Sequence, residues 1–421
     1  MKKKNIILIS LDEVRPDNLS CYGYSNIQTA NIDQIASEGV RFETCITSSE
    51  LTPIAMSSVI TGKYPNKTTY RNPFCYVNGP TIADILKEQG YNSAGFVGNG
   101  LLGKKHGFGS SFNFWNEPSN DSQWNRGTYP GYEKIMHYEG NYWVEEFFNW
   151  LKKNYNNPFF IWGHFYETHE GSEHQLLEKG LIKESKLTDF GYKDAKIKMA
   201  DENLIGRLIN ILNELNLYEE IILVVLSDHG TNLGEHEVDP IPWRKGGIRY
   251  PQHTTMYDHD LKVALIIKDK NLPKNKEIKG MVRSIDLVPT LLALIGISKG
   301  NIDFDGKSLL PVIEKGQAEG EEVYSEDLFE VRGRGAIQAI RTDSFKFIRN
   351  LTLGIEEYYD LNNDPQEKSN IKDRAKDQTL IELRKKMNGF LMSIPQTKTK
   401  EFSDKEKEEI KERLKRLGYI K

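Results

Sequence analysis

The feature that most constrains the fold is a run of apolar, β-branched residues that stops abruptly at a carboxylate. Asn5–Leu11 contains such a run, and Asp12 follows it directly. Runs of this kind predict strands buried on both faces, which are typical of parallel sheets. The pattern returns at Ile221–Leu226 before SDHG, at Phe159–Trp162 before GHFYETH, and at Val263–Ile267. The sequence therefore predicts a buried, mostly parallel sheet.

Segments with apolar residues at helical spacing lie between these strands, so β and α elements alternate. The predicted helices are 31–39, 55–61, 81–90, 142–154, 195–216 and 286–295. From about residue 320, the short candidate strands VYSED, AIQAIRT, FKFIRN and EEYYDL indicate a small antiparallel sheet. The expected fold class is α/β: a large mostly parallel sheet flanked by helices, followed by a small C-terminal antiparallel sheet and a terminal helix. The expected domains are 1–319, 320–395 and 396–421.

Composition excludes several classes of protein. The chain has 421 residues, with 56 Lys and Arg against 60 Asp and Glu, so we expect no nucleic-acid binding. Three cysteines cannot build a disulfide framework. No stretch reaches the roughly 18 apolar residues needed to span a bilayer, and the apolar run after MKKK is too short for a signal peptide. We therefore expect a soluble, cytoplasmic protein, for which a homo-oligomer stays open.

Polar residues at the ends of the predicted strands indicate a metal site. In open α/β sheets, chemistry takes place just beyond the carboxyl ends of the strands. Asp12 and Glu13 follow one strand, and Asp228 and His229 follow another. Carboxylate and imidazole ligands together suit a divalent cation. The alternative for an isolated Asp-Glu pair is a helix cap or an ion pair with Arg15.

The segment SSELTPIAMSSVITGKYP, residues 48–65, places hydroxyl groups at the start of a short helix. A hydroxyl there can be turned toward a bound anion and activated by a metal. The alternative interpretation is that Thr52, before Pro53, is a helix N-cap.

Taken together, these blocks resemble the sulfatase family of the alkaline phosphatase superfamily almost from end to end. LDEVRPDNLSCYGY resembles the opening metal-ligand strand, TPIAMSSVITGKYP the nucleophile helix, and SDHGTNLGEH the second metal-ligand pair. QHTTMYDHDLKVALII, VRSIDLVPTLLALIGI, FDGKSLLP and EEYYDLNNDPQEKSNI are similar to the later blocks of the family. The resemblance implies an ester hydrolase that uses a divalent metal.

The chain departs from the family at the nucleophile. The family's sulfatases carry a C-x-P-x-R core whose Cys or Ser is oxidised to formylglycine, and the corresponding residue here is Thr52. Threonine carries a methyl group on Cβ and cannot form that aldehyde. Phosphoryl-transferring relatives use a plain threonine, so the sequence favours phosphodiesters or phosphomonoesters, with Thr52 as nucleophile. Pro53 is one place closer than in the family pattern, which leaves Ser49 as an alternative nucleophile.

Two other functions remain open at this stage. One is a sulfatase that acts on sulfate esters without formylglycine. The other is a phosphoryl or headgroup transferase, or a non-catalytic binding member of the fold. The expected substrate is a phosphate or sulfate ester of a small molecule, glycan or lipid headgroup.

The resemblance also implies a set of site residues. The metal ligands are expected to be Asp12, Glu13, Thr52, Asp228 and His229, with Mn²⁺ preferred over Ca²⁺, Mg²⁺ and Zn²⁺. Asn99 is expected to bind the substrate, although an Asn between two glycines also suits a turn. His169 and His253 are candidates to protonate the leaving alcohol. A second metal could use His169 and His253 together with His174 and His236.

Overall fold

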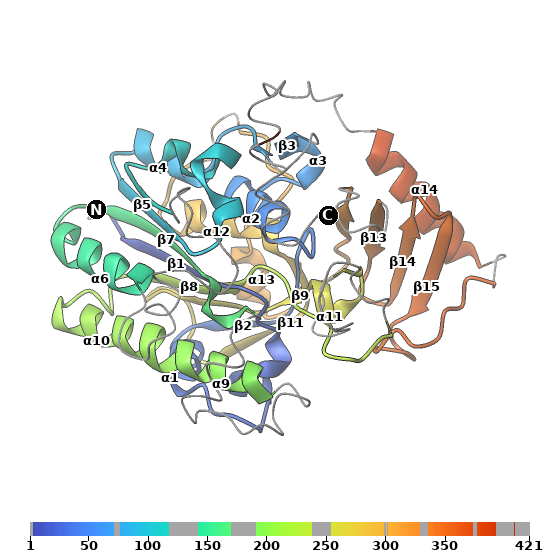
Figure 1. Cartoon of the computed structure of the whole chain (residues 1–421), viewed down its shortest axis with the longest axis horizontal. Helices are drawn as coiled ribbons and strands as arrows, with labels where there is room; N and C mark the ends of the chain where they lie inside the picture. The colour runs from blue at the N-terminus through green and yellow to red at the C-terminus, as the bar shows by residue number, and fades with distance from the viewer. Residues whose placement is uncertain are drawn as a thin grey trace.

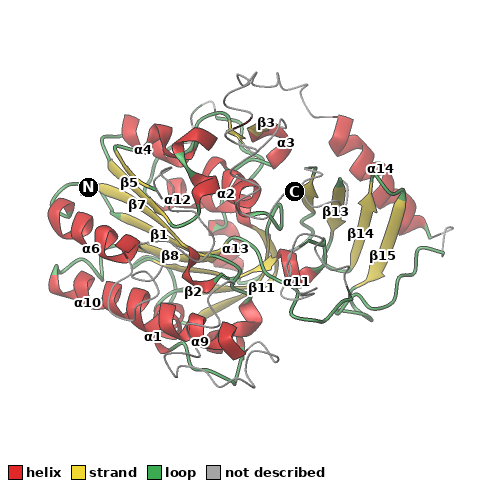
Figure 2. Cartoon of the chain, viewed as in Figure 1, coloured by secondary structure: helices red, strands yellow, loops and turns green. Residues whose placement is uncertain are grey.

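In the computed structural model, the large sheet has its helices on both faces (Figures 1 and 2). The structure describes residues 3–70, 76–117, 142–169, 191–237, 254–298, 300, 302–328, 336–373, 377–392 and 408. The large sheet has the order β11-β2-β10-β8-β1-β7-β5-β6, with β9 paired to β2. Its strands are β1 (Ile6–Leu11), β2 (Val40–Ile46), β5 (Asn92–Val97), β6 (Phe114–Asn116), β7 (Phe159–Phe165), β8 (Ile222–Ser227), β9 (Lys262–Val263), β10 (Leu265–Lys268) and β11 (Lys276–Arg283).

The predicted fold class is confirmed: β1 runs parallel to both β7 and β8 and is buried along its whole length. One predicted strand differs in direction, because β10 is antiparallel to β8 and β2. An apolar run indicates that a strand is buried on both faces, but it does not indicate the direction of the strand. The run Val263–Ile267 therefore has the same pattern as its parallel neighbours.

Alternate residues of β1 pack against two separate layers of helices. Ile6 and Leu8 belong to a core with α2, α4, α12 and α13, whereas Ile7 and Ile9 belong to a core with α1, α6, α9 and α10. The helices are α1 (Ala30–Ser37), α2 (Thr52–Thr61), α3 (Pro65–Thr68), α4 (Ile82–Glu88), α6 (Tyr142–Asn154), α9 (Gly191–Ala200), α10 (Arg207–Glu214), α11 (Asp258–Leu261), α12 (Leu287–Leu294), α13 (Leu310–Lys315) and α14 (Gln378–Met392). A π-helical segment, Asp201–Gly206, joins α9 to α10 within the predicted helix 195–216.

The small sheet lies at one end of the molecule, next to α14 (Figure 1). Its four antiparallel strands are β12 (Val323–Asp327), β13 (Ile337–Arg341), β14 (Phe345–Asn350) and β15 (Ile355–Asp360). A separate hairpin pairs β3 (Thr69–Tyr70) with β4 (Tyr76–Val77). The domain boundary near 320 stays a prediction, and the terminal helix 396–421 lies outside the described residues except for Glu408.

A buried ion network ties the small sheet to α11. Asp258 accepts hydrogen bonds from Arg341 of β13, at 2.9 Å from Nη2, and from Lys346 of β14, at 2.5 Å. Lys346 also lies 2.7 Å from Glu367 and is fully buried. These contacts join the small sheet to α11. Truncating one partner would leave a buried charge uncompensated, which is strongly destabilising.

Among the described residues, no helix is both long and apolar enough to cross a membrane.

Candidate active site

The register of the large sheet brings the predicted metal ligands together. Leu11, the last residue of β1, pairs with Ser227 at the end of β8. Asp12 and Asp228 therefore leave neighbouring strands at the same edge of the sheet. Both carboxylates are fully buried, as is the imidazole of His229.

Three hydrogen-bond acceptors converge at this point. His229 Nδ1 donates to the carbonyl of Gly230 at 2.8 Å, which leaves Nε2 with its lone pair. His229 Nε2 lies 3.4 Å from Asp228 Oδ2 and 3.8 Å from Asp12 Oδ1. Within the described part of the chain, neither carboxylate oxygen has a hydrogen-bond partner. Buried acceptors that face one another need a cation between them, so this donor set fits a divalent metal.

Electrostatics support the same conclusion. Burial raises the pKa of Asp12 well above its ordinary value, and the neighbouring Asp228 carboxylate raises it further. A bound cation would remove this cost by pairing the two charges.

Thr52 points at the same centre instead of capping its helix. It is the first residue of α2, and Leu51 occupies the N-cap position. Its hydroxyl lies 3.1 Å from His229 Nε2, and the residue is 3% exposed. Ser49 is placed differently, because its hydroxyl donates to Glu50 and accepts the amide N–H of Leu51. The Thr52 hydroxyl therefore lies next to the candidate metal site, and its role as nucleophile stays a prediction.

A directional chain of hydrogen bonds orients Asp12 from behind. Trp162 Nε1 donates to Ser10 Oγ at 2.9 Å, and Ser10 Oγ lies 2.9 Å from His164 Nδ1. His164 Nε2 lies 3.1 Å from Asp12 Oδ2. Burial lowers the pKa of His164, so the neutral ring accepts at Nδ1 and donates at Nε2. This arrangement directs the other oxygen of Asp12 toward His229.

Glu13, the predicted fourth ligand, faces a different group of residues. Its backbone is left-handed, with φ of 58°, which costs a non-glycine residue about 1–2 kcal/mol. Lys193 of α9 donates to Glu13 Oε2 at 2.9 Å, and His169 Nε2 lies 3.2 Å from Oε1. Strain of this kind persists where the surrounding contacts over-determine the conformation, and it clusters at functional sites.

The predicted substrate-handling residues fall into three groups. Burial lowers the pKa of His169 to about 3, so its ring is neutral at neutral pH and suits an acceptor or ligand better than a proton donor. Asn99 accepts the amide N–H of Leu101 through Oδ1, as expected of a turn, and its substrate role stays a prediction. His253 and His174 lie outside the described residues.

His236 contacts the segment around Gln366 and the ring of Tyr257, and its role at a second metal site stays a prediction. Its Nε2 donates to the carbonyl of Gln366 at 2.8 Å, and its ring stacks on Tyr257 with centroids 4.0 Å apart. The contact joins the loop after His229 to the segment that follows the small sheet.

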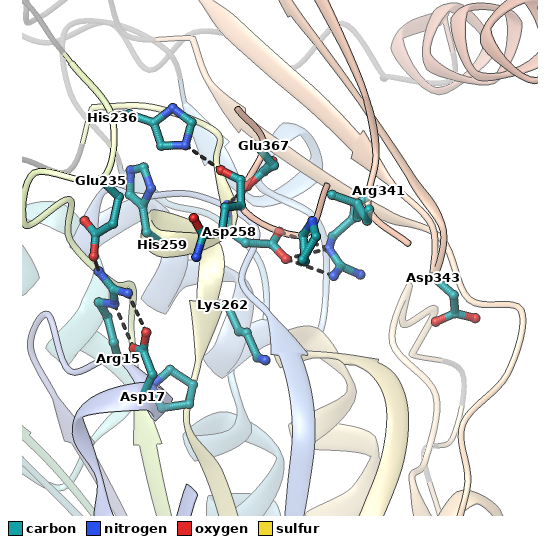
Figure 3. A pocket seen from close by; sticks show the side chains of 14 residues that line it. Arg15, Asp17, Glu235, His236, Asp258, His259, Lys262, Arg341, Asp343 and Glu367 are labelled. Atoms are coloured by element: carbon teal, nitrogen blue, oxygen red, sulfur yellow. Dashed lines mark hydrogen bonds and ion pairs between the residues drawn. The ribbon is translucent and has the colours of Figure 1, made fainter. Parts of the chain in front are cut away.

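A cavity of about 470 Å³ lies between the two sheets (Figure 3), and its lining residues include neither Thr52 nor the predicted metal ligands. Arg15, two residues after Glu13 in the sequence, lines this cavity. Its guanidinium forms ion pairs with Asp17 and Glu235, each at 2.5 Å. The side chains that Figure 3 labels around it are polar or charged: Arg15, Asp17, Glu235, His236, Asp258, His259, Lys262, Arg341, Asp343 and Glu367. Cations and carboxylates therefore make up most of the lining.

Sequence reasoning missed Lys193. This residue lies before the predicted helix 195–216 and is 180 residues from Glu13, so no local pattern signals the contact. His164 sits inside a buried strand, where a polar residue is unusual, and this position indicates a core or supporting role such as the contact with Asp12.

The chain is similar to known proteins over most of its length. Residues 4–297 match the family model described as Sulfatase, and residues 246–393 match the one described as N-sulphoglucosamine sulphohydrolase, C-terminal. The chain is 24% identical to N-acetylglucosamine-6-O-sulfatase of Bacteroides thetaiotaomicron, over 97% of this chain and 88% of that protein. It is 25% identical to an arylsulfatase of Clostridium perfringens, over 88% of this chain and 90% of that protein.

Solved structures share the fold. A protein solved in complex with its substrate D-glucosamine-2-N,6-O-disulfate matches with a TM-score of 0.71 and 20% identity, over 96% of this chain and 100% of that one. The phosphonate monoester hydrolase of Agrobacterium radiobacter matches with a TM-score of 0.68 and 19% identity, over 93% of this chain and 95% of that one.

Proposed function

Because the chain belongs to the sulfatase family of ester hydrolases, we propose that it is a metal-dependent hydrolase of sulfate esters on sugars, with Thr52 as nucleophile. The observation that carries the proposal is the position of the Thr52 hydroxyl, 3.1 Å from His229 Nε2 and beside the buried carboxylates of Asp12 and Asp228. The proposed nucleophile and the proposed cation site thus lie side by side, which suits metal-assisted ester hydrolysis.

The proposed mechanism assigns a task to each residue. When bound, a divalent ion supplies positive charge against the ester oxygens and lowers the pKa of a neighbouring hydroxyl. Asp12, Asp228 and His229 would hold that ion, and the Thr52 hydroxyl, 3.1 Å from His229 Nε2, would lie beside it. Thr52 Oγ1 gives its proton to water and attacks sulfur, the bond from sulfur to the sugar oxygen breaks, and the leaving alkoxide takes a proton from water to become the alcohol. Water then attacks the sulfur of the sulfated Thr52 and the bond from sulfur to Oγ1 breaks. One proton of that water restores the Thr52 hydroxyl, and the other leaves with the released sulfate or passes to solvent.

Support for a sulfated sugar comes from the relatives and from the cavity. One relative is named an N-acetylglucosamine-6-O-sulfatase, and one structural neighbour was solved with a glucosamine disulfate as its substrate. The cavity beside Arg15 is polar and of mixed charge, which suits the hydroxyl groups of a sugar.

Phosphate or phosphonate esters are the second candidate, and Thr52 itself favours them. Threonine cannot become formylglycine, so a sulfated Thr52 cannot release sulfate by collapse of an aldehyde hydrate, and water must attack its sulfur directly. Metal-assisted attack of water on phosphorus is the ordinary route for a phosphorylated threonine, which needs no aldehyde. The structural neighbour named as a phosphonate monoester hydrolase shows that the fold accommodates phosphorus substrates.

The metal proposed is Mn²⁺, followed by Ca²⁺, Mg²⁺ and Zn²⁺. Two carboxylates, a hydroxyl and one imidazole form a mostly hard donor set with one borderline ligand, which is the mixture that Mn²⁺ accepts.

A substrate screen distinguishes the two candidates. N-acetylglucosamine-6-sulfate and an aryl sulfate would be compared with an aryl phosphomonoester, an aryl phosphodiester and an aryl phosphonate. Each would be assayed after chelation and after return of each metal. Asp228→Asn is the matched control, since it removes the negative charge of one proposed metal ligand and preserves side-chain volume. We expect the sulfate esters to react fastest and only with metal present. Faster turnover of every phosphorus ester would transfer the assignment to the second candidate.

A further inference from the structure

Two groups of metal-ligating side chains share Asp12. One is Asp12, Asp228 and His229, and the other is Asp12, Glu13 and His169, with the ligand atoms of each group within 4.8 Å of one another. Adjacent groups of this kind could hold two divalent ions about 4 Å apart, as two-metal hydrolases do. A lysine distinguishes the second group from the first.

Lys193 places a fixed positive charge against the second group. Its ammonium lies 2.9 Å from Glu13 Oε2 and 2.9 Å from the carbonyl oxygen of Thr168. The residue is only 1% exposed, and a lysine this deeply buried is held by its partners. Its helix, α9, packs on the 3-10 turn Tyr166–Thr168 that leads to His169.

The charges balance with one divalent ion and not with two. Asp12, Glu13 and Asp228 are fully buried and together carry three negative charges when ionised. Lys193 and one divalent ion supply three positive charges. A second divalent ion would leave two positive charges that these buried carboxylates do not compensate, which is unfavourable.

We propose that Lys193 takes the place of a second divalent cation, holding Glu13 in its left-handed conformation and limiting the site to one metal ion. Lys193 is thus a positioning residue that acts through Glu13. This inference rests on the metal site of the proposed function, but not on the identity of the substrate.

The test counts metal ions and requires no substrate. Wild type and Lys193→Met would be dialysed to equilibrium against Mn²⁺, and bound metal measured by elemental analysis. Lys196→Met is the matched control, because Lys196 is also buried in α9 but donates to a backbone carbonyl, that of His169. The double variant Glu13→Gln with Lys193→Met removes the charge and the carboxylate together. Lys193→Gln, which keeps a donor for Thr168 without the charge, serves if the Met variant does not fold.

We expect one ion per chain in wild type, in Lys196→Met and in the double variant, and two in Lys193→Met or Lys193→Gln. Two ions in wild type, or one ion with unchanged affinity in the neutral Lys193 variants, would overturn the inference and leave the proposed function standing. No bound ion in wild type would instead remove the metal on which the proposed function rests.

Discussion

Two aspartates of the short helix α11 are predicted to respond to pH in opposite ways. Burial raises the pKa of Asp260 from an ordinary 3.8 to about 7, although hydrogen bonds from Thr255 oppose the rise. Burial would raise the pKa of Asp258 too, but Arg341 and Lys346 outweigh it and hold that pKa well below its usual range.

The perturbation is Asp260→Asn. This substitution keeps an acceptor for the Thr255 hydroxyl, which lies 2.7 Å from Asp260 Oδ2, and removes the titratable carboxyl group. Between pH 4 and pH 7, the unfolded carboxyl is ionised while the folded one still holds its proton, so wild-type stability falls as pH rises. Each pH unit in that window costs up to about 1.4 kcal/mol, and the full cost of ionising Asp260 in the folded protein is roughly 4 kcal/mol.

The assay is urea unfolding of wild type and variant at pH 5, 6, 7 and 8. The free energy of unfolding of wild type, minus that of Asp260→Asn, should fall by about 3 kcal/mol over this range and level off above pH 7. Asp258 itself contributes no slope in this range, because its stabilisation is complete above its unfolded pKa and is lost only at lower pH. A flat or rising difference for Asp260→Asn would refute the reasoning.

Three further predictions concern the ion network and the metal site. Lys346→Met should lower the free energy of unfolding by about 3–5 kcal/mol, because Glu367 loses its buried cation; a loss below about 1 kcal/mol in urea unfolding would contradict this. His164→Leu should weaken Mn²⁺ binding about 10–100-fold by releasing Asp12, as measured by titration calorimetry; unchanged affinity would show that the hydrogen-bond chain does not orient the ligand. Chelation should lower the melting temperature by restoring repulsion between Asp12 and Asp228, and added Mn²⁺ should reverse the loss; a melting temperature insensitive to metal would count against a cation site.

The sequence was sufficient for most of the fold because burial leaves a local signal. Runs such as Ile6–Leu11 are apolar on both faces, and the four strands of the small sheet stand where their alternation predicts them. β2 was not predicted from the sequence, because the partly exposed Arg41 and Glu43 interrupt its apolar run near the edge of the sheet. The reversed direction of β10 depends on how distant segments pair, which residue type does not encode.

The candidate site was predictable for residues that directly follow a strand, because the end of the strand determines the edge of the sheet at which they lie. Asp12 and Asp228 meet because their strands pair in register, which a parallel sheet implies. The environment of Glu13 was not predictable, since its partner Lys193 arrives from a helix 180 residues away. The choice between sulfate and phosphate was drawn from the single residue Thr52, whereas the relatives weigh toward sulfate esters.

The measurement that tests the account most directly is the turnover of Thr52 variants on the best substrate of the screen. Thr52→Ala should lower kcat by at least about three orders of magnitude while metal content and fold are retained, and Thr52→Ser should keep part of the rate. Ser49→Ala is the matched control and should stay close to wild type, because its hydroxyl faces Glu50 and Leu51. Full activity of Thr52→Ala together with an inactive Ser49→Ala would contradict the account and move the nucleophile to Ser49.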